Sequence, residues 1–367
     1  MSISLAKRFG EEIMDYVYRF PVVRGLQAGR KYFIGMVPLK MISRLFPNDE
    51  EYVPPEYRAQ RKLNTSRIPE ISKYILQNRH DYVFSALAAS IDGKFKFIPA
   101  DLTSDIGVLE VSMDSRFQIN DGQHRKAAII EALVEDETLG DETISVVFFE
   151  DKGLTRSQQI FTDLNKHAVK TSNSISELYD SRDDLAVVTR KVVSSVKFIN
   201  TFTDKEKDNL GKFSSNLFAL NMFYKANKKI IQRMDVDTEC EKFLIEFWSC
   251  VSENIVQWNE LLNKEISKVD LRENYIITQA VVIQALGRVG NYFFMHQKSD
   301  MHARLKRLQN IDWKRTSPQW HLRTIRANGR MISSETAVVL TANVIKQSLG
   351  IELDEEEKMK EQKFLNR

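Results

Sequence analysis

A run of consecutive residues between a predicted strand and a predicted helix has the chemistry to bind a phosphate group. These residues are Asp121, Gly122, Gln123, His124 and Arg125. The backbone N–H groups of a first helical turn point outward, and the helix macrodipole adds partial positive charge at that end. Gly122 would let a ligand approach the backbone, while His124 and Arg125 would add hydrogen-bond donors. The sequence therefore predicts an anion-binding turn at this junction.

Asp163 and Asn165 could extend this site toward a nucleotide. A carboxylate and an amide oxygen near a phosphate can share a Mg²⁺ through waters, which would make a nucleotide with Mg²⁺ the cofactor. The alternative is an ordinary helix C-terminus, where Asn is common. Asp121 also has two interpretations, because an Asp at such a junction can simply cap the helix by accepting an N–H one turn ahead. No residue is assigned to catalysis or to direct metal binding.

The segment from Arg304 to Arg330 has the composition of a surface that contacts double-stranded DNA. It contains a single acid, Asp312, and aromatic residues are interleaved with its cations. Lysines and arginines at this density can neutralise phosphates and release counterions, while indole and guanidinium planes can stack. The alternative is a solvated helix face beside a core tryptophan. The basic residues are Arg304, Lys306, Arg307, Lys314, Arg315, Arg323, Arg326 and Arg330, and the aromatic ones are Trp313, Trp320 and His321.

The composition limits the class of protein. With 367 residues, 43% of them apolar, two domains are expected, since single cores stop growing beyond about 250 to 300 residues. The net charge of +3 does not by itself indicate nucleic acid. The longest apolar stretch, 275–295, is interrupted by polar residues, and the N-terminus lacks the apolar block of a secretion signal. We therefore expect a cytoplasmic protein without membrane spans, in which Cys240 and Cys250 are reduced core thiols.

Elements of the first half must position the predicted turn. Phe20–Phe33 mixes β-forming residues with turn glycines, and residues 39–46 have helical spacing, so a strand, a loop and a short helix are expected. A helix should begin near Ile68 and end near Asn78.

Two strand pairs are expected between this helix and the turn. Asp92-Gly93 lies between Tyr82–Ile91 and Lys94–Ile98 and has the composition of a two-residue hairpin loop. Val108–Met113 and Arg116–Asn120 are expected to form a second pair. Beyond the turn, a helix, a strand at 144–149 and a helix that begins near 155 are expected.

The overall expectation is an α+β chain. A mixed-sheet domain would span residues 1–190, and an all-helical domain with the basic segment 304–330 would span 191–350. No convincing strand alternation occurs after residue 174. A charged tail, 351–367, is expected to be a frayed helix. Helical periodicity in the second half is clearest at 217–231, 240–262 and 275–296.

The run from Asp121 to Arg125 resembles the sequence that names the DGQHR-domain family. Other stretches resemble that family in the same order, over roughly residues 15 to 185. These are Arg24–Phe33, Gln60–Arg67, and Phe161–Asn165 followed by Lys170 and Ser172. Within the family, the length, the helical second half and the stretch Arg24–Arg30 are most similar to the DndB group of DNA phosphorothioation systems.

This resemblance implies a mixed-sheet fold related to ParB and sulfiredoxin, in which the matching turn holds nucleotide phosphates in some members. It also implies a bacterial, DNA-binding transcriptional regulator of a phosphorothioation gene cluster. The implied partners are double-stranded DNA and other phosphorothioation proteins, with a homo-oligomer as one option. Gln123 stands where a sulfiredoxin has Cys, so reduction of sulfur acids is not expected, and the sequence departs from the arginine-rich box of CTP-binding ParB proteins.

Two other functions remain open. The first is a nucleotide-hydrolysing or DNA-nicking enzyme that uses the phosphate turn, and the second is a scaffold that binds other proteins through its helical half. A metal-dependent enzyme would need clustered carboxylates or histidines, and the candidates are limited to Asp121, His124, Asp163 and Asn165. The regulator is therefore ranked first and the enzyme second.

Overall fold

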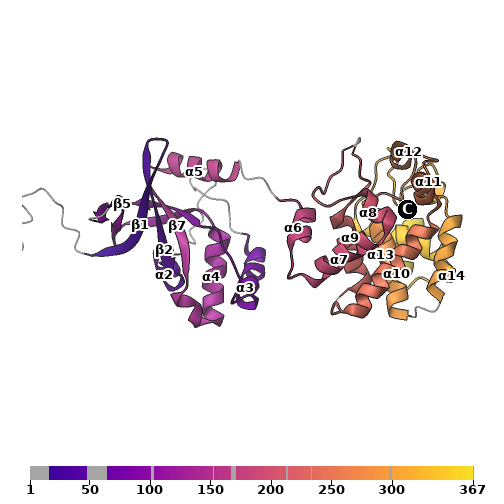
Figure 1. Cartoon of the computed structure of the whole chain (residues 1–367), viewed down its shortest axis with the longest axis horizontal. Helices are drawn as coiled ribbons and strands as arrows, with labels where there is room; N and C mark the ends of the chain where they lie inside the picture. The colour runs from indigo at the N-terminus through magenta and orange to yellow at the C-terminus, as the bar shows by residue number, and fades with distance from the viewer. Residues whose placement is uncertain are drawn as a thin grey trace, which may run out of the picture. The chain divides into compact units, whose positions relative to one another are not determined.

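The chain forms two compact units. The computed structural model describes residues 16–47, 64–100, 103–151, 153–166, 171–211, 214–232, 234–296 and 300–366. The units are Met1–Val169 and Lys170–Arg367 (Figure 1), so the division lies earlier in the chain than the expected boundary at residue 190. The first contains a mixed sheet and the second is mostly helical, which confirms the α+β class. Within the described ranges, no helix is long and apolar enough to cross a membrane.

A mixed sheet is the framework of the first unit. Its strands are β1 (Val17–Gln27), β2 (Arg30–Pro38), β3 (Leu87–Asp92), β4 (Phe95–Ala100), β5 (Thr103–Ser112), β6 (Arg116–Asp121) and β7 (Thr143–Glu150). In the described part of the chain they form one seven-stranded sheet with the order β4-β5-β1-β2-β7-β3-β6. β3 and β7 run parallel, and the other neighbouring pairs run antiparallel.

The expected hairpin turn at Asp92-Gly93 is wrong. β3 pairs with β6 while β4 pairs with β5, so the strands on either side of Gly93 do not face each other. They are two arms of one strand that bends at Gly93, where φ is 140°. The partner strand bends at the same level between β5 and β6, where the Ser112 N–H donates to the Lys94 carbonyl at 3.0 Å. The second expected pair, β5 with β6, is likewise two arms of this one long, bent hairpin.

Four helices and two short 3₁₀ turns accompany the sheet in the described part of the first unit. They are α2 (Leu39–Leu45), α3 (Ile68–Gln77), α4 (Gln123–Glu135) and α5 (Leu154–Lys166), with short 3₁₀ turns η2 (Thr65–Arg67) and η3 (Glu137–Asp141). The end of α3 at Asn78 confirms the prediction. α3 and α4 lie side by side, while α5 lies apart from them (Figure 1). α4 buries Ala128, Ile129 and Ala132, which positions its first turn against the sheet.

Helices dominate the second unit, as expected. They are α6 (Asn173–Tyr179), α7 (Asp184–Ser195), α8 (Lys197–Phe202), α9 (Leu220–Ile231), α10 (Thr238–Asn254), α11 (Val256–Leu262), α12 (Lys268–Asn274), α13 (Ala280–His296), α14 (Met301–Leu305), α15 (Glu335–Ser348) and α16 (Glu355–Leu365). A short parallel pair, β8 (Thr203–Asp204) with β9 (Phe218–Ala219), corrects the expectation that this half has no strands.

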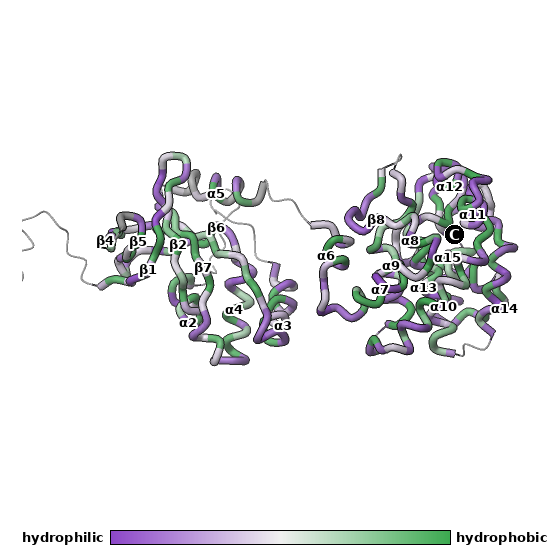
Figure 2. The backbone as a smooth tube through the Cα atoms, in the orientation of Figure 1, coloured by the Kyte–Doolittle hydropathy of each residue, from purple (hydrophilic) through white to green (hydrophobic). Residues whose placement is uncertain are grey.

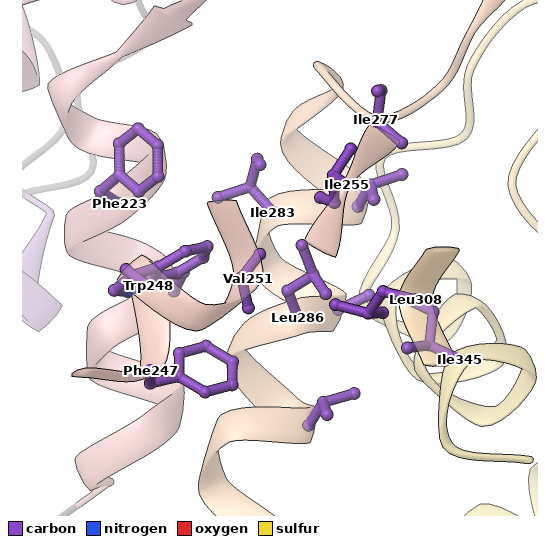
Figure 3. Close-up of a cluster of buried hydrophobic side chains, with 14 of the residues drawn as sticks. Phe223, Phe247, Trp248, Val251, Ile255, Ile277, Ile283, Leu286, Leu308 and Ile345 are labelled. Carbon is purple, nitrogen blue, oxygen red and sulfur yellow. The ribbon is translucent and has the colours of Figure 1, made fainter. Parts of the chain in front are cut away.

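The core of the second unit is rich in buried aromatic side chains. Phe223, Phe247 and Trp248 lie on the facing helices α9 and α10, and Leu286 of α13 extends the cluster (Figure 3). Hydrophobic residues recur along these helices (Figure 2), and many of them are buried in this core. Both cysteines are buried and, within the described residues, neither forms a disulfide, which confirms that they are core thiols.

The charged tail is a docked helix, and the expectation that it is frayed is wrong. Glu357 of α16 is 0% exposed, and both its carboxylate oxygens accept hydrogen bonds from Lys346 Nζ, at 2.7 and 2.8 Å. Arg288 contributes a further ion pair at 3.1 Å. Asp354 caps the helix through the Glu357 N–H at 2.8 Å. The charge pattern of the tail therefore supplies buried counter-charges, a role that sequence periodicity does not show.

Glu177 of α6 is a buried carboxyl with an incomplete set of hydrogen bonds. It is 8% exposed, Asn221 donates to its Oε1, and its Oε2 has no partner within the described residues. Burial raises the pKa of Glu177 to about 7, against the lowering effect of the hydrogen bond from Asn221, and Asp208 and Asp183 add repulsion.

We predict that ionisation of Glu177 destabilises the second unit. Between pH 4.5 and about 7 the folded state retains a proton that the unfolded chain has released, so stability falls as pH rises through this interval. Glu177→Gln should remove this dependence and raise the free energy of unfolding at pH 8 by on the order of 1 to 3 kcal/mol. Urea unfolding of both proteins at pH 5 and pH 8 measures the effect. The same pH slope in both proteins would contradict it.

Candidate functional site

The predicted phosphate turn forms the corner between β6 and α4. β6 ends at Asp121, and Gly122 is the N-cap of α4 with φ of 99°. The N-cap makes no side-chain hydrogen bond to the helix, so the expectation that Asp121 caps α4 is wrong. The carboxylate of Asp121 instead pairs with Arg125, with 2.7 Å between Oδ2 and Nη2. Asp121 is not the N-cap because it still belongs to the strand and Gly122, in the left-handed region, follows it.

Arg125 is held by the protein on two sides. Its Nη2 binds Asp121, its Nη1 donates to the hydroxyl of Ser85, and its side chain is 19% exposed. A phosphate at this corner must therefore compete with the Asp121 carboxylate for the guanidinium. The corner can bind an anion only through a rearrangement of this pair or through the other donors of the helix end.

His124 links the corner to the segment before α3. Its Nε2 accepts the backbone N–H of Asn64 at 3.1 Å, and the Asn64 side chain in turn caps η2. An imidazole nitrogen that accepts a hydrogen bond carries no proton, so this contact requires the neutral ring with its proton on Nδ1. His124 therefore orients the segment that precedes α3.

Gly122 fits a site where a side chain has no space. A Cβ at this position would lie 2.4 Å from Leu87 Cδ2 and 2.9 Å from Arg125 Nη2. The glycine therefore serves packing as well as the left-handed φ, and this is a second reason for its presence besides access to a ligand.

A separate pocket of about 380 Å³ lies between the β1–β2 turn and α5. Asp163 lines this pocket and accepts a hydrogen bond from Gln159 at 2.6 Å. None of residues 121–125 lines it, so the structure does not bring Asp163 to the phosphate turn. The other lining residues are Gln27, Ala28, Arg30, Lys31, Tyr32, Phe149, Glu150, Ile160 and Leu164.

Of the two residues expected to share a Mg²⁺, only Asp163 has a described side chain. The side chain of Asn165, residues 60–62 and Lys170 lie outside the described part of the chain. Where side chains are described, no group of His, Cys, Asp and Glu is arranged to hold a metal ion. Gln27, Arg30 and Tyr32 line one pocket together with Asp163 and Leu164, a relation that their distance in the sequence concealed.

Half of the predicted DNA-binding cations bind groups of their own unit. Arg304 pairs with Asp300 at 2.5 Å, and Arg307 donates to the Leu349 carbonyl at 3.3 Å. Arg323 pairs with Glu361 at 2.5 Å, with both side chains 12% exposed, and its guanidinium lies over Phe364. Arg315 donates to the Arg272 carbonyl.

The tryptophans of this segment lie in the core, which is the alternative that the sequence left open to stacking on bases. Trp313 and Trp320 are 1% and 0% exposed, and they stack on each other with their ring centroids 5.5 Å apart. Their indole N–H groups donate to the Leu308 and Asp312 carbonyls. The indoles are core residues because their ring area is removed from water inside the unit.

The remaining cations of the segment face solvent. Arg326 and Arg330 share a tight turn in which the Arg326 N–H donates to the Arg330 carbonyl at 2.8 Å. Among the described residues these side chains have no ion-pair partner. We define the exposed cations as Lys306, Lys314, Arg326 and Arg330.

One comparison with known proteins gives a match over most of the chain. A family model described as DndB, DNA-sulfur modification-associated, matches residues 20–352. Curated proteins and solved structures give no match. The match includes both units, whereas the expected relation to ParB and sulfiredoxin stays a prediction.

We predict that Gly122→Ala destabilises the first unit more than Gly153→Ala does. Both glycines have a positive φ, 99° and 96°, so both substitutions strain the backbone. A Cβ at Gly153 meets nothing within 4 Å, whereas one at Gly122 overlaps Leu87. The difference in the free energy of unfolding should be about 1 to 3 kcal/mol, measured by denaturant titration. Equal losses would show that packing at the corner is loose.

Proposed function

The chain belongs to the DndB family of DNA-sulfur modification-associated proteins, and from this premise we propose that it is a DNA-binding transcriptional regulator of a DNA phosphorothioation gene cluster. Double-stranded DNA is the proposed partner, and other phosphorothioation proteins are further partners. The bacterial cytoplasm is the proposed location. Family membership supports involvement in DNA sulfur modification, and the exposed cations support DNA contact.

The exposed cations are the observation that carries the DNA-binding part of the proposal. They lie within one short stretch of the chain, and the described carboxylates leave them unpaired. Solvated lysines and arginines of this kind bind phosphates through counterion release, which is independent of base sequence. Sequence preference must therefore come from other contacts of the protein.

The corner from Asp121 to Arg125 is proposed as a second contact with a phosphate. Its support is the positive end of α4 and the side chains of His124 and Arg125. Because Arg125 is paired with Asp121, a phosphate can bind its guanidinium only if it displaces the Asp121 carboxylate.

We predict that Arg326→Gln with Arg330→Gln weakens DNA binding and reduces its salt dependence. Each lost phosphate contact should lower the slope of log K against log salt by about 0.9. The melting temperature should stay close to that of the parent because both side chains are exposed. Mobility shifts over a salt series measure the slope, with Lys228→Gln, an exposed cation on α9, as the control.

The same assay tests the regulatory part of the proposal. DNA from upstream of the protein's own gene cluster should bind more tightly than random DNA of equal length at physiological salt. Equal affinity for both DNAs would contradict a regulatory role. An unchanged salt slope in the variant with Arg326→Gln and Arg330→Gln would show that these two arginines face solvent without contacting DNA.

A further inference from the structure

Arg315 is a partly buried cation without an ion-pair partner in the part of the chain that the structure describes. It lies where the 313–315 segment pairs with the end of α12, since its N–H donates to the Asn274 carbonyl at 2.8 Å. Its Nη2 donates to the Arg272 carbonyl at 3.0 Å, and its Nε is buried without a partner. The guanidinium is therefore fixed in place by the backbone, with part of its hydrogen-bonding capacity unused.

No carboxylate of the described residues forms an ion pair with Arg315. Burial lowers the pKa of Arg315, and no acidic group opposes this effect. Burial also lowers the pKa of Arg272, whose side chain donates to the carbonyls of Gly211 and Asn216. Lys314, next in the chain, is exposed. Arg272 and Lys314 therefore lie beside Arg315, whose own charge is partly desolvated.

Several other poorly exposed cations of the same unit have counter-charges. Arg323 has Glu361, and Lys346 shares Glu357 with Arg288. An unpaired charge in a partly dry site is unfavourable, and the usual solution inside a fold is an acidic partner. Among the described residues Arg315 has no such acidic partner, and an anion from outside the chain could supply one.

We propose that Arg315, with the adjacent Lys314, binds one backbone phosphate of DNA and that this phosphate supplies the missing counter-charge. A guanidinium held by the backbone is oriented in advance for charge-assisted hydrogen bonds to phosphate oxygens. The inference rests on the proposed function, because DNA is the anion that a DNA-binding regulator meets. Arg315 would thus make a phosphate contact that is partly shielded from water, in addition to the solvent-exposed contacts of the exposed cations.

The proposal predicts that removing the Arg315 charge lowers DNA affinity without lowering the melting temperature. Arg315→Met removes an unpaired charge, so the melting temperature of the full-length protein should stay the same or rise. DNA affinity should fall about 10- to 100-fold, because a charge-assisted contact is lost. Arg323→Met, which removes a guanidinium that has an acidic partner, should instead lower the melting temperature. Arg315→Lys, which retains the charge without the planar fork, should keep part of the affinity.

The test uses melting curves and DNA titrations of the parent and the three variants, with a duplex from upstream of the gene cluster and with inorganic phosphate alone. A destabilised Arg315→Met protein that retains the parent's DNA affinity overturns the proposal, since Arg315 would then be structural. Failure of the parent to bind any DNA overturns the proposed function. In that case, a phosphate-induced rise in melting temperature that Arg315→Met abolishes would assign the site to free phosphate in place of DNA.

Discussion

A charge that leaves water needs a counter-charge, and this constraint organises the second unit. The carboxylate of Glu357 is fully buried, and it is compatible with folding only because Lys346 and Arg288 reach it. That cluster holds α16 against α15. The helix then presents Glu361 to Arg323, so a residue from the middle of the basic segment becomes part of the fold. The acidic tail and the basic segment are therefore two halves of one structural arrangement.

This arrangement limits which residues of the basic segment can contact DNA. Its charge density suggested a continuous surface for DNA, but burial and pairing divide it into residues with different roles. Two tryptophans stack in the core, several arginines bind carbonyls or carboxylates, and only the exposed cations face solvent unpaired among the described residues. Solvated cations contribute salt-dependent, sequence-independent affinity. A DNA-binding surface on this unit is thus narrower than the segment that encodes it.

The first unit depends on a different constraint, the change of direction at two glycines. Gly93 bends one long hairpin so that its arms join different neighbours in the sheet, and Gly122 ends β6 and starts α4. The second corner is closed by the Asp121–Arg125 pair and by the contact of His124 with the Asn64 backbone. The motif therefore has a structural task at the corner, and any anion it binds must be accommodated within those contacts.

The sequence by itself determined the features that depend on local periodicity and side-chain chemistry. The end of α3 at Asn78, the strand-to-helix junction at Gly122 and the helical second unit could all be predicted, because neighbouring residues decide them. Strand pairing, the docking of the tail and the division of the basic segment could not. A bend and a turn have the same local pattern, and a charged residue has the same sequence signature whether it faces water or an acid. Only the tertiary structure decided these features, because partners far apart in the chain determine hydrogen bonding, burial and charge neutralisation.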